Sequence, residues 1–178
     1  MNKLVVPFII LFFISAASAQ DLSSSLFSSK SNSEFSSYSK SGFSPTVSLG
    51  MMGGVAKMNG NTGYSVGLFA ELRTETFSFV PLANYWKTNV ENDFEAAGLV
   101  RLRFKSGSME PYADGGIGVN FLSYDNNNIK LGLDLGGGLD FTGAGSNYSL
   151  FIDAKYKVIV GDPNIKGFTV NFGLKFTL

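Results

Sequence analysis

The stretch that decides the fold is residues 167–178, which read GFTVNFGLKFTL. Because successive side chains of a β-strand point to opposite faces, its alternation predicts a strand with one apolar wall and one wall of polar residues and glycine. Twelve residues are long for a globular strand, but a strand that crosses a bilayer at a tilt needs about 9–11. The apolar parity comprises Phe168, Val170, Phe172, Leu174, Phe176 and Leu178.

The same alternation recurs upstream, interrupted by short turns rich in glycine and asparagine. Short connections join antiparallel neighbours, and an up-and-down meander of eight long strands closes most simply as a barrel, which leaves no edge strand unpaired. The predicted fold is therefore all-β, an eight-stranded antiparallel up-and-down barrel over residues 45–178. Its strands are expected near residues 46–57, 62–73, 76–87, 93–105, 110–123, 129–141, 147–160 and 167–178.

Two segments precede the predicted barrel. Residues 1–19 are typical of a cleaved signal peptide, with Lys3, an apolar centre over residues 4–14, and Ala17-Ser18-Ala19 as the cleavage pattern. Residues 20–44 are rich in serine, with twelve serines between positions 21 and 44. Such a composition buries too little apolar surface to fold alone, which predicts a flexible periplasmic segment, with a plug or partner-binding segment as the alternative.

The composition argues against several classes of chemistry. The chain has no histidine and no cysteine, so imidazole acid–base catalysis, disulfides and metal sites built on these side chains are excluded. Without Lys3, 13 basic residues stand against 14 acidic ones, and no basic patch favours nucleic acid. We therefore predict no catalytic residue, no cofactor and no metal site.

The polar parity of the predicted strands carries both signs of charge in equal number. In an outer-membrane barrel this parity lines the lumen, whereas in a soluble, lipocalin-like barrel it faces water and the apolar parity surrounds a ligand. The predicted lumen charge network contains Glu71, Glu95, Arg101, Arg103, Asp114, Lys130, Asp134, Asp140, Asp153, Lys155, Lys157 and Lys175.

The aromatic residues of the apolar parity favour the membrane interpretation. They gather near both ends of the strands, as in the aromatic girdles of membrane barrels. Glycines on the polar parity are expected to make room for long lysine and arginine side chains in a narrow lumen. One predicted girdle contains Tyr64, Tyr85, Phe94, Phe121 and Phe168, and the other contains Phe77, Phe104, Phe141, Tyr148 and Phe176.

Over residues 45–178 the chain resembles the small outer-membrane β-barrel proteins of Gram-negative bacteria, of the OmpA- and OmpX-like eight-stranded type. The resemblance rests on strand number, alternation and the segment 77–85, FSFVPLANY, which is similar to a third-strand pattern of porin-like members. The final residue is Leu178, where an aromatic residue is usual, and Phe176 stands two positions earlier. The resemblance implies a location in the outer membrane, contact with its lipid, and an assembly signal in residues 168–178 for the insertion machinery.

These features predict an integral outer-membrane barrel, expected to be monomeric, with a largely closed, charge-paired lumen and a structural or envelope role without catalysis. A small porin-like transporter of small or hydrophobic molecules is the first alternative, and a soluble lipocalin-like periplasmic binding barrel is the second. A transporter would use a hydrophobic recess among apolar residues on the otherwise polar parity. The candidates for this recess are Phe69, Leu82, Trp86, Leu99 and Leu122.

Overall fold

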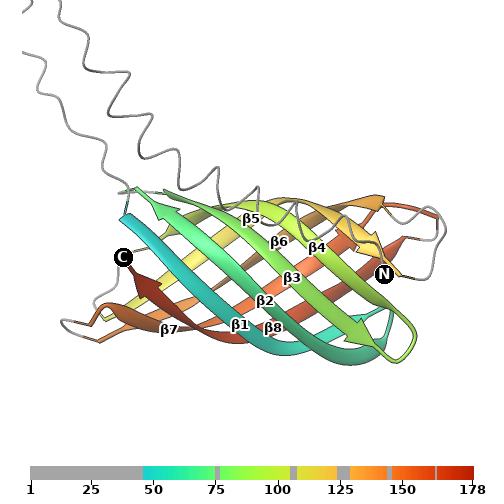
Figure 1. Ribbon diagram of the computed structural model, residues 1–178, viewed down its shortest axis with the longest axis horizontal. Coiled ribbons are helices and arrows are strands. Elements are labelled where there is room, and N and C mark those ends of the chain that lie inside the picture. Colours follow the sequence, from blue (N-terminus) through green and yellow to red (C-terminus); the bar gives the residue numbers. More distant parts are fainter. Residues whose placement is uncertain (1–45, 75–76, 105–107, 124–128, 144–145, 163) are drawn as a thin grey trace, which may run out of the picture. The chain divides into compact units, whose positions relative to one another are not determined.

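The computed structural model describes residues 46–74, 77–104, 108–123, 129–143, 146–162 and 164–178. Within them, each of eight strands pairs antiparallel with the next and the last pairs with the first, which closes the barrel (Figure 1). The predicted fold and strand number are confirmed, and the predicted bounds agree to within two residues. The predicted signal peptide and serine-rich segment lie outside the described residues. The strands are β1 (Thr46–Met58), β2 (Asn61–Arg73), β3 (Phe77–Thr88), β4 (Asn92–Arg103), β5 (Met109–Leu122), β6 (Ile129–Thr142), β7 (Tyr148–Ile159) and β8 (Ile165–Thr177).

The register fixes the width of the barrel. Paired residues followed around the sheet leave β1 at Lys57 and return to β1 at Val47, ten residues earlier. Such a stagger tilts the strands against the barrel axis, and eight strands enclose an interior just wide enough for side chains to fill. The path runs through Lys57, Phe168, Tyr156, Leu135, Gly115, Val100, Phe79, Leu72 and Val47.

The two ends of the barrel are distinguished by their connections. At one end, Asn59 and Gly60 form a two-residue turn between β1 and β2, and both have positive φ angles, of 48° and 86°. This backbone is the one that Asn-Gly favours in tight hairpins. The Asn59 amide donates to the Lys166 carbonyl at 2.8 Å, which fixes the turn to β8. We call this the hairpin end, and we call the opposite end, where β1 begins and β8 finishes, the terminal end.

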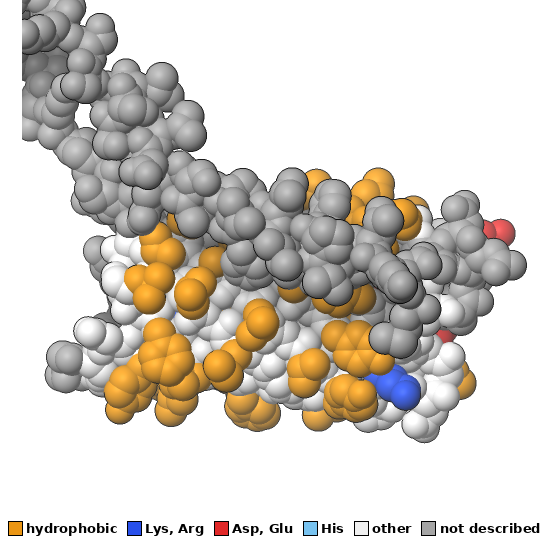
Figure 2. Space-filling model, in the orientation of Figure 1, with side chains coloured by type: hydrophobic (Ala, Val, Ile, Leu, Met, Phe, Trp, Pro, Cys, Tyr) orange, Lys and Arg blue, Asp and Glu red, His pale blue; other side chains and the backbone are white. Residues whose placement is uncertain are grey.

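The apolar parity faces outward. Ile117, Leu131 and Leu135 are each about two-thirds exposed, at 65–66%, and the described surface in Figure 2 is dominated by hydrophobic side chains. A lipocalin-like barrel would place these side chains inside around a ligand, so the soluble alternative is wrong for this chain. Among the described residues, no helix is long and apolar enough to cross a bilayer.

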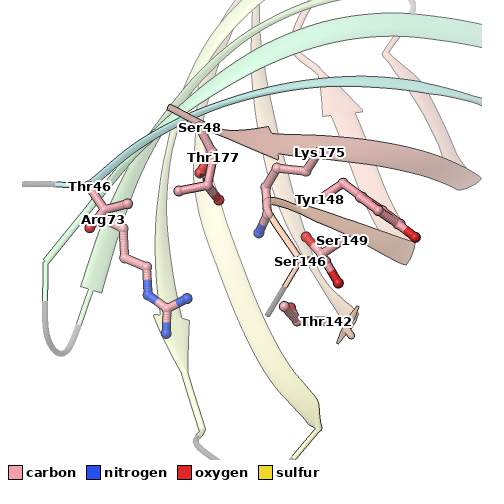
Figure 3. A pocket seen from close by; sticks show the side chains of 9 residues that line it. All are labelled: Thr46, Ser48, Arg73, Thr142, Ser146, Tyr148, Ser149, Lys175 and Thr177. Atoms are coloured by element: carbon pink, nitrogen blue, oxygen red, sulfur yellow. Dashed lines mark hydrogen bonds between the residues drawn. The ribbon is translucent and has the colours of Figure 1, made fainter. Parts of the chain in front are cut away.

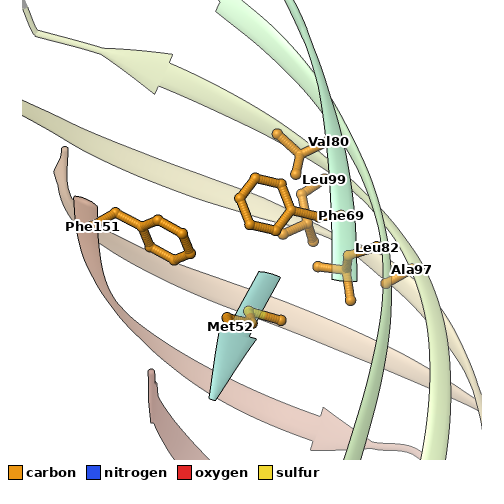
Figure 4. Close-up of a cluster of buried hydrophobic side chains, with 7 residues drawn as sticks. All are labelled: Met52, Phe69, Val80, Leu82, Ala97, Leu99 and Phe151. Atoms are coloured by element: carbon orange, nitrogen blue, oxygen red, sulfur yellow. The ribbon is translucent and has the colours of Figure 1, made fainter. Parts of the chain in front are cut away.

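Inside the barrel, the buried apolar side chains form two separate clusters. The mid-lumen cluster contains two rings, Phe69 and Phe151, whose centroids lie 5.3 Å apart at an interplanar angle of 81° (Figure 4). Its full membership is Met52, Phe69, Val80, Leu82, Ala97, Leu99 and Phe151. The hairpin-end cluster consists of Ala56, Met58, Trp86, Leu122, Ile159 and Ile165.

The inward glycines make room for side chains of several kinds, aromatic rings among them. A β-carbon at Gly50 would lie 2.2 Å from the Phe69 ring, and one at Gly173 would lie 2.1 Å from the Phe151 ring. The expectation that these glycines make room for lysine and arginine holds at Gly136, where a β-carbon would meet the Lys155 chain at 2.8 Å. Elsewhere on the inward parity it is corrected: a β-carbon at Gly67 would meet Met52 and one at Gly132 would meet Asn120, neither of which is a lysine or arginine.

Candidate functional site: the charged lumen

The terminal half of the lumen holds a network of ion pairs that we call the terminal-end network. It joins four carboxylates to four cations, and all eight side chains are nearly inaccessible to solvent. Six of the eight strands contribute to it, so it ties together parts of the barrel wall that are not adjacent in the sheet. Its members are Glu71, Arg101, Arg103, Asp114, Asp140, Asp153, Lys155 and Lys175.

Glu71 on β2 is the centre of one part of this network. Its carboxylate accepts hydrogen bonds from Arg103 and from Lys175 Nζ, the latter at 3.0 Å, and lies 3.8 Å from Arg101. Arg103 and Lys175 also donate to Asp140 Oδ2, each at 2.6 Å. Two cations and two carboxylates from β2, β4, β6 and β8 thus alternate in a closed cycle across the lumen.

Tyr112 is the centre of the other part, and sequence reasoning did not single it out. The Arg101 guanidinium lies 3.7 Å from the Tyr112 ring centroid and donates to Asp114 Oδ2 at 2.8 Å. The Tyr112 hydroxyl donates to Asp153 Oδ2 at 2.9 Å, and Lys155 pairs with Asp153. The available signal was the position of Tyr112 on the inward parity, two residues before Asp114.

A polar cavity of about 170 Å³ opens next to this network at the terminal end (Figure 3). Arg73 and Lys175 supply its positive charge, but Arg73 already pairs with Glu110 at 3.0 Å and Lys175 belongs to the network. None of the predicted recess residues lines it. Its lining consists of Thr46, Ser48, Arg73, Thr142, Ser146, Tyr148, Ser149, Lys175 and Thr177.

The hairpin half of the lumen has fewer ion pairs. Lys157 Nζ donates to Glu95 Oε2 at 2.5 Å and to both oxygens of Asp134, at 2.8 and 2.7 Å. Asp93 is also fully buried here, yet neither of its oxygens accepts a hydrogen bond of good geometry and no cation of the described chain pairs with it. Asp93 stands directly opposite Trp86 in the β3–β4 pairing. Asp93 has the same parity as Glu95, which predicts an inward side chain, but Asp93 was not among the predicted residues of the lumen charge network.

The structure brings eleven of the twelve predicted network residues into ion pairs of two groups, the terminal-end network and the Lys157 group. The twelfth, Lys130, is half-buried and lies beside Gly161, at the hairpin end. The predicted recess residues are all buried and separate into the two apolar clusters: Phe69, Leu82 and Leu99 lie mid-lumen, while Trp86 and Leu122 lie at the hairpin end.

The residues of the predicted assembly signal lie on the outer face of β8 and at its end. Phe168, Phe172, Phe176 and Leu178 are exposed, whereas Val170 and Leu174 are half-buried. On its inner face β8 contributes Lys175 to the terminal-end network. Within the described residues, no group of three or more carboxylate, histidine or cysteine side chains is arranged to hold a metal ion.

Three solved structures share this architecture. Neisserial surface protein A has a TM-score of 0.66 at 14% identity, over 74% of this chain and 97% of that one. The N-terminal β-barrel domain of Pseudomonas aeruginosa OprF has a TM-score of 0.57 at 10% identity, over 76% and 100%. The outer membrane enzyme PagL has a TM-score of 0.50 at 18% identity, over 71% and 97%.

These neighbours are eight-stranded outer-membrane β-barrels of Gram-negative bacteria, and the chain has their fold. At such low identities the likeness extends to the fold alone. No protein-family model and no characterised protein sequence matches the chain.

Proposed function

We propose that the chain is an integral protein of the Gram-negative outer membrane, a monomeric barrel with a closed lumen and a structural role in the envelope without catalysis. The observation that carries this proposal is the filling of the lumen. The terminal-end network, the mid-lumen cluster, the Lys157 group and the hairpin-end cluster follow one another from end to end. Because every strand is paired on both sides, the barrel needs no second copy to complete its sheet.

The outer surface supports the membrane location. Large apolar side chains are exposed on every strand. On β4, Ala96 and Gly98 occupy the outward middle, and Val100 and Leu102 continue the band beyond them. Aromatic neighbours lie close together toward the hairpin end: the Tyr64 and Tyr85 rings are 6.3 Å apart, and those of Phe94 and Phe121 are 6.1 Å apart. Aromatic girdles beside an apolar band are typical of barrels that span a membrane.

The absence of catalysis is inferred from chemistry and not from the fold, since PagL is an enzyme on the same fold. The chain has no histidine or cysteine to activate a hydroxyl or to serve as a thiol nucleophile. The buried carboxylates Glu71, Asp114, Asp134 and Asp140 are engaged with lysine or arginine, which suits structural pairing better than proton transfer.

Solute entry into proteoliposomes tests the closed lumen. Vesicles that contain the full mature chain should swell in small sugars no faster than protein-free vesicles, while a large open porin serves as the positive control. Rapid sugar entry through the wild-type barrel would overturn the closed lumen and favour the porin-like transporter.

Fractionation and gel mobility test the membrane location. The protein should partition with the outer membrane and migrate as a compact band in SDS until it is boiled. Leu135→Arg, on the lipid-facing side, should destabilise the reconstituted barrel by about 2–4 kcal/mol, because a charge there enters the apolar part of the bilayer. Recovery of the wild-type chain in the soluble periplasmic fraction would overturn the location.

The exposed face of β8 is proposed as the signal that the outer-membrane assembly machinery reads. Phe176 and Phe141 offer a matched pair, because both are outward phenylalanines near the terminal end with 44% and 39% exposure. Phe176→Ala should lower the amount of assembled barrel in cells, whereas Phe141→Ala should not. Both variants should refold equally in detergent; a similar loss for both in cells would remove the special role of β8.

A further inference from the structure

The charged side chains on the outer wall of the strands are all positive, and all lie at the hairpin end. Along the eight described strands, the outward parity carries three charged side chains, and all are exposed lysines at the hairpin end: Lys57, Lys87 and Lys166. We call them the hairpin-end lysines. In Figure 2 the basic surface in view lies toward the end opposite the C-terminus. The other outward positions of the strands are apolar or uncharged.

The hairpin-end lysines also lie on one side of the barrel. Lys57 is on β1 and pairs with Phe168 of β8, two residues from Lys166 on the same face. Lys87 is on β3 and pairs with Tyr64 of β2, so it stands about two strand spacings, or ~10 Å, from Lys57 around the wall. The three ammonium groups therefore share the arc formed by β8, β1, β2 and β3.

Within the described residues, no carboxylate pairs with the lysines of this arc. None of the three lysines makes a side-chain ion pair or hydrogen bond within the described residues. Of the acidic residues described at this end, Glu91 and Asp162 lie in the loops beyond the strands, and Asp93 points into the lumen. Like charges held close together repel each other, and a bound anion removes that repulsion.

We propose that the hairpin-end lysines bind the phosphate groups of a phosphorylated glycolipid in the leaflet that surrounds the hairpin end. The inference rests on the proposed outer-membrane location, and it goes further by assigning a lipid class, a side of the barrel and an orientation. It places the hairpin end at the cell surface and the terminal end in the periplasm.

The position of the lysines relative to the aromatic residues supports a lipid over a soluble anion. Phe168 and Tyr64 are the direct cross-strand partners of Lys57 and Lys87, and both rings are exposed to the same side. Aromatic rings mark the depth of the membrane interface, and lysine extends its ammonium from there to the headgroups. The apolar band below, with Val55 and Val66 exposed on the same arc, offers a surface for the acyl chains.

Binding of lipid A to the purified full mature chain tests the proposal. The variant Lys57→Gln/Lys87→Gln/Lys166→Gln removes the charge, and the corresponding triple substitution by arginine keeps it. In low salt and detergent, wild type should bind diphosphorylated lipid A roughly 100-fold more tightly than the glutamine variant, if each lysine contributes about fivefold. The arginine variant should retain the binding, and added salt should weaken it.

Three comparisons make the outcome decisive. Dephosphorylated lipid A should bind wild type and the glutamine variant equally, and equal binding of the two lipid A forms by wild type would overturn the proposal. Competition by inorganic phosphate at the lipid's own concentration would assign a soluble anion instead and also overturn it. Retention of the compact, unboiled SDS band by every variant shows that the barrel is intact, so a lost lipid preference is separable from a failure of the proposed membrane location.

Orientation provides an independent readout. Since the chain has no cysteine, single cysteines at the exposed loop positions Asn89 and Asn147 can be labelled selectively. Asn89→Cys, at the hairpin end, should react with a membrane-impermeant maleimide on intact cells, and Asn147→Cys, at the terminal end, should react only after the cells are opened. The reverse pattern would contradict the proposal.

Discussion

The two halves of the lumen are closed by different physics. In the terminal half, four carboxylates and four cations pair with one another, and Tyr112 is held between Arg101 and Asp153. In the hairpin half, a single fully buried lysine, Lys157, serves Glu95 and Asp134, and six apolar side chains close the end. Ion pairs between matched charges fill the terminal half, whereas packed apolar side chains that exclude water fill the hairpin half.

This difference predicts different consequences of mutation. A buried ion network adds little net stability compared with apolar packing, but the loss of one partner leaves an uncompensated charge. An apolar cluster loses the removed contacts and gains a cavity. The terminal half should therefore be sensitive to changes of charge, and the hairpin half should be sensitive to changes of volume.

The largest effect is expected at Glu71. Glu71→Ala leaves Arg103 and Lys175 each with one carboxylate fewer, and it should lower the free energy of unfolding by about 3–5 kcal/mol. Urea unfolding in lipid vesicles measures this through the fluorescence of Trp86, the chain's single tryptophan. Glu110→Ala is the milder comparison: Glu110 also pairs with Arg103, at 3.2 Å, but its side chain is 20% exposed and can be replaced by water, so the change should cost about 1 kcal/mol. An equal loss of unfolding free energy at both positions would mean that the network does not depend on Glu71.

Leu122 tests the hairpin end by volume alone. Leu122→Ala removes a fully buried side chain from the hairpin-end cluster and should cost about 2–5 kcal/mol. Leu131→Ala makes the same change on the outer wall, where Leu131 is 66% exposed and lipid can replace the lost contacts. It should therefore cost much less in the same unfolding experiment. A cost at Leu131 as large as at Leu122 would contradict the packed hairpin end.

A substitution at Gly50 tests the packing of the mid-lumen cluster, which lies between the two halves of the lumen. Gly50→Ala places a methyl group within 2.2 Å of the Phe69 ring and should cost about 1–3 kcal/mol. Phe69→Leu has a flexible end in place of the rigid ring, so the double variant should recover part of the loss. A double-mutant cycle measures this coupling. Strict additivity of the two changes would show that the ring does not hold its position over Gly50.

Much of this architecture could be predicted from alternation. The run Leu133, Asp134, Leu135 already assigns alternate residues to opposite faces, and the same argument placed nearly every charge of the lumen. Alternation also fixed the strand number, because each apolar stretch ends at a turn such as Asn59-Gly60.

The partners inside the lumen could not be predicted in the same way. Lys157 on β7 reaches Glu95 on β4, three strands along the sheet, and this contact depends on the ten-residue stagger of the whole barrel. Likewise, no local pattern indicates that the Phe69 ring leans over Gly50. Contacts across a lumen are set by closure of the barrel, which is a property of all eight registers together.

The smallest effect on the free energy of unfolding is expected at Asp93. The direction of this effect distinguishes the hairpin half from the terminal half. Asp93→Asn removes a buried carboxylate that makes no ion pair with a described cation, and it keeps the shape of the side chain. The unfolding free energy should change by no more than about 1 kcal/mol, and an increase is the favoured direction because the desolvation cost of the charge disappears.

Asp140→Asn is the matched change in the terminal half. Asp140 accepts hydrogen bonds from both Arg103 and Lys175, each at 2.6 Å, and the neutral amide should cost about 1.5–3 kcal/mol. The same exchange of one carboxylate oxygen for an amide nitrogen is thus nearly neutral where the lumen is closed by apolar packing and costly where it is closed by charge. If Asp93→Asn were as costly as Asp140→Asn, the Asp93 carboxylate would need a cation of its own, and the hairpin half would depend on matched charge as the terminal half does.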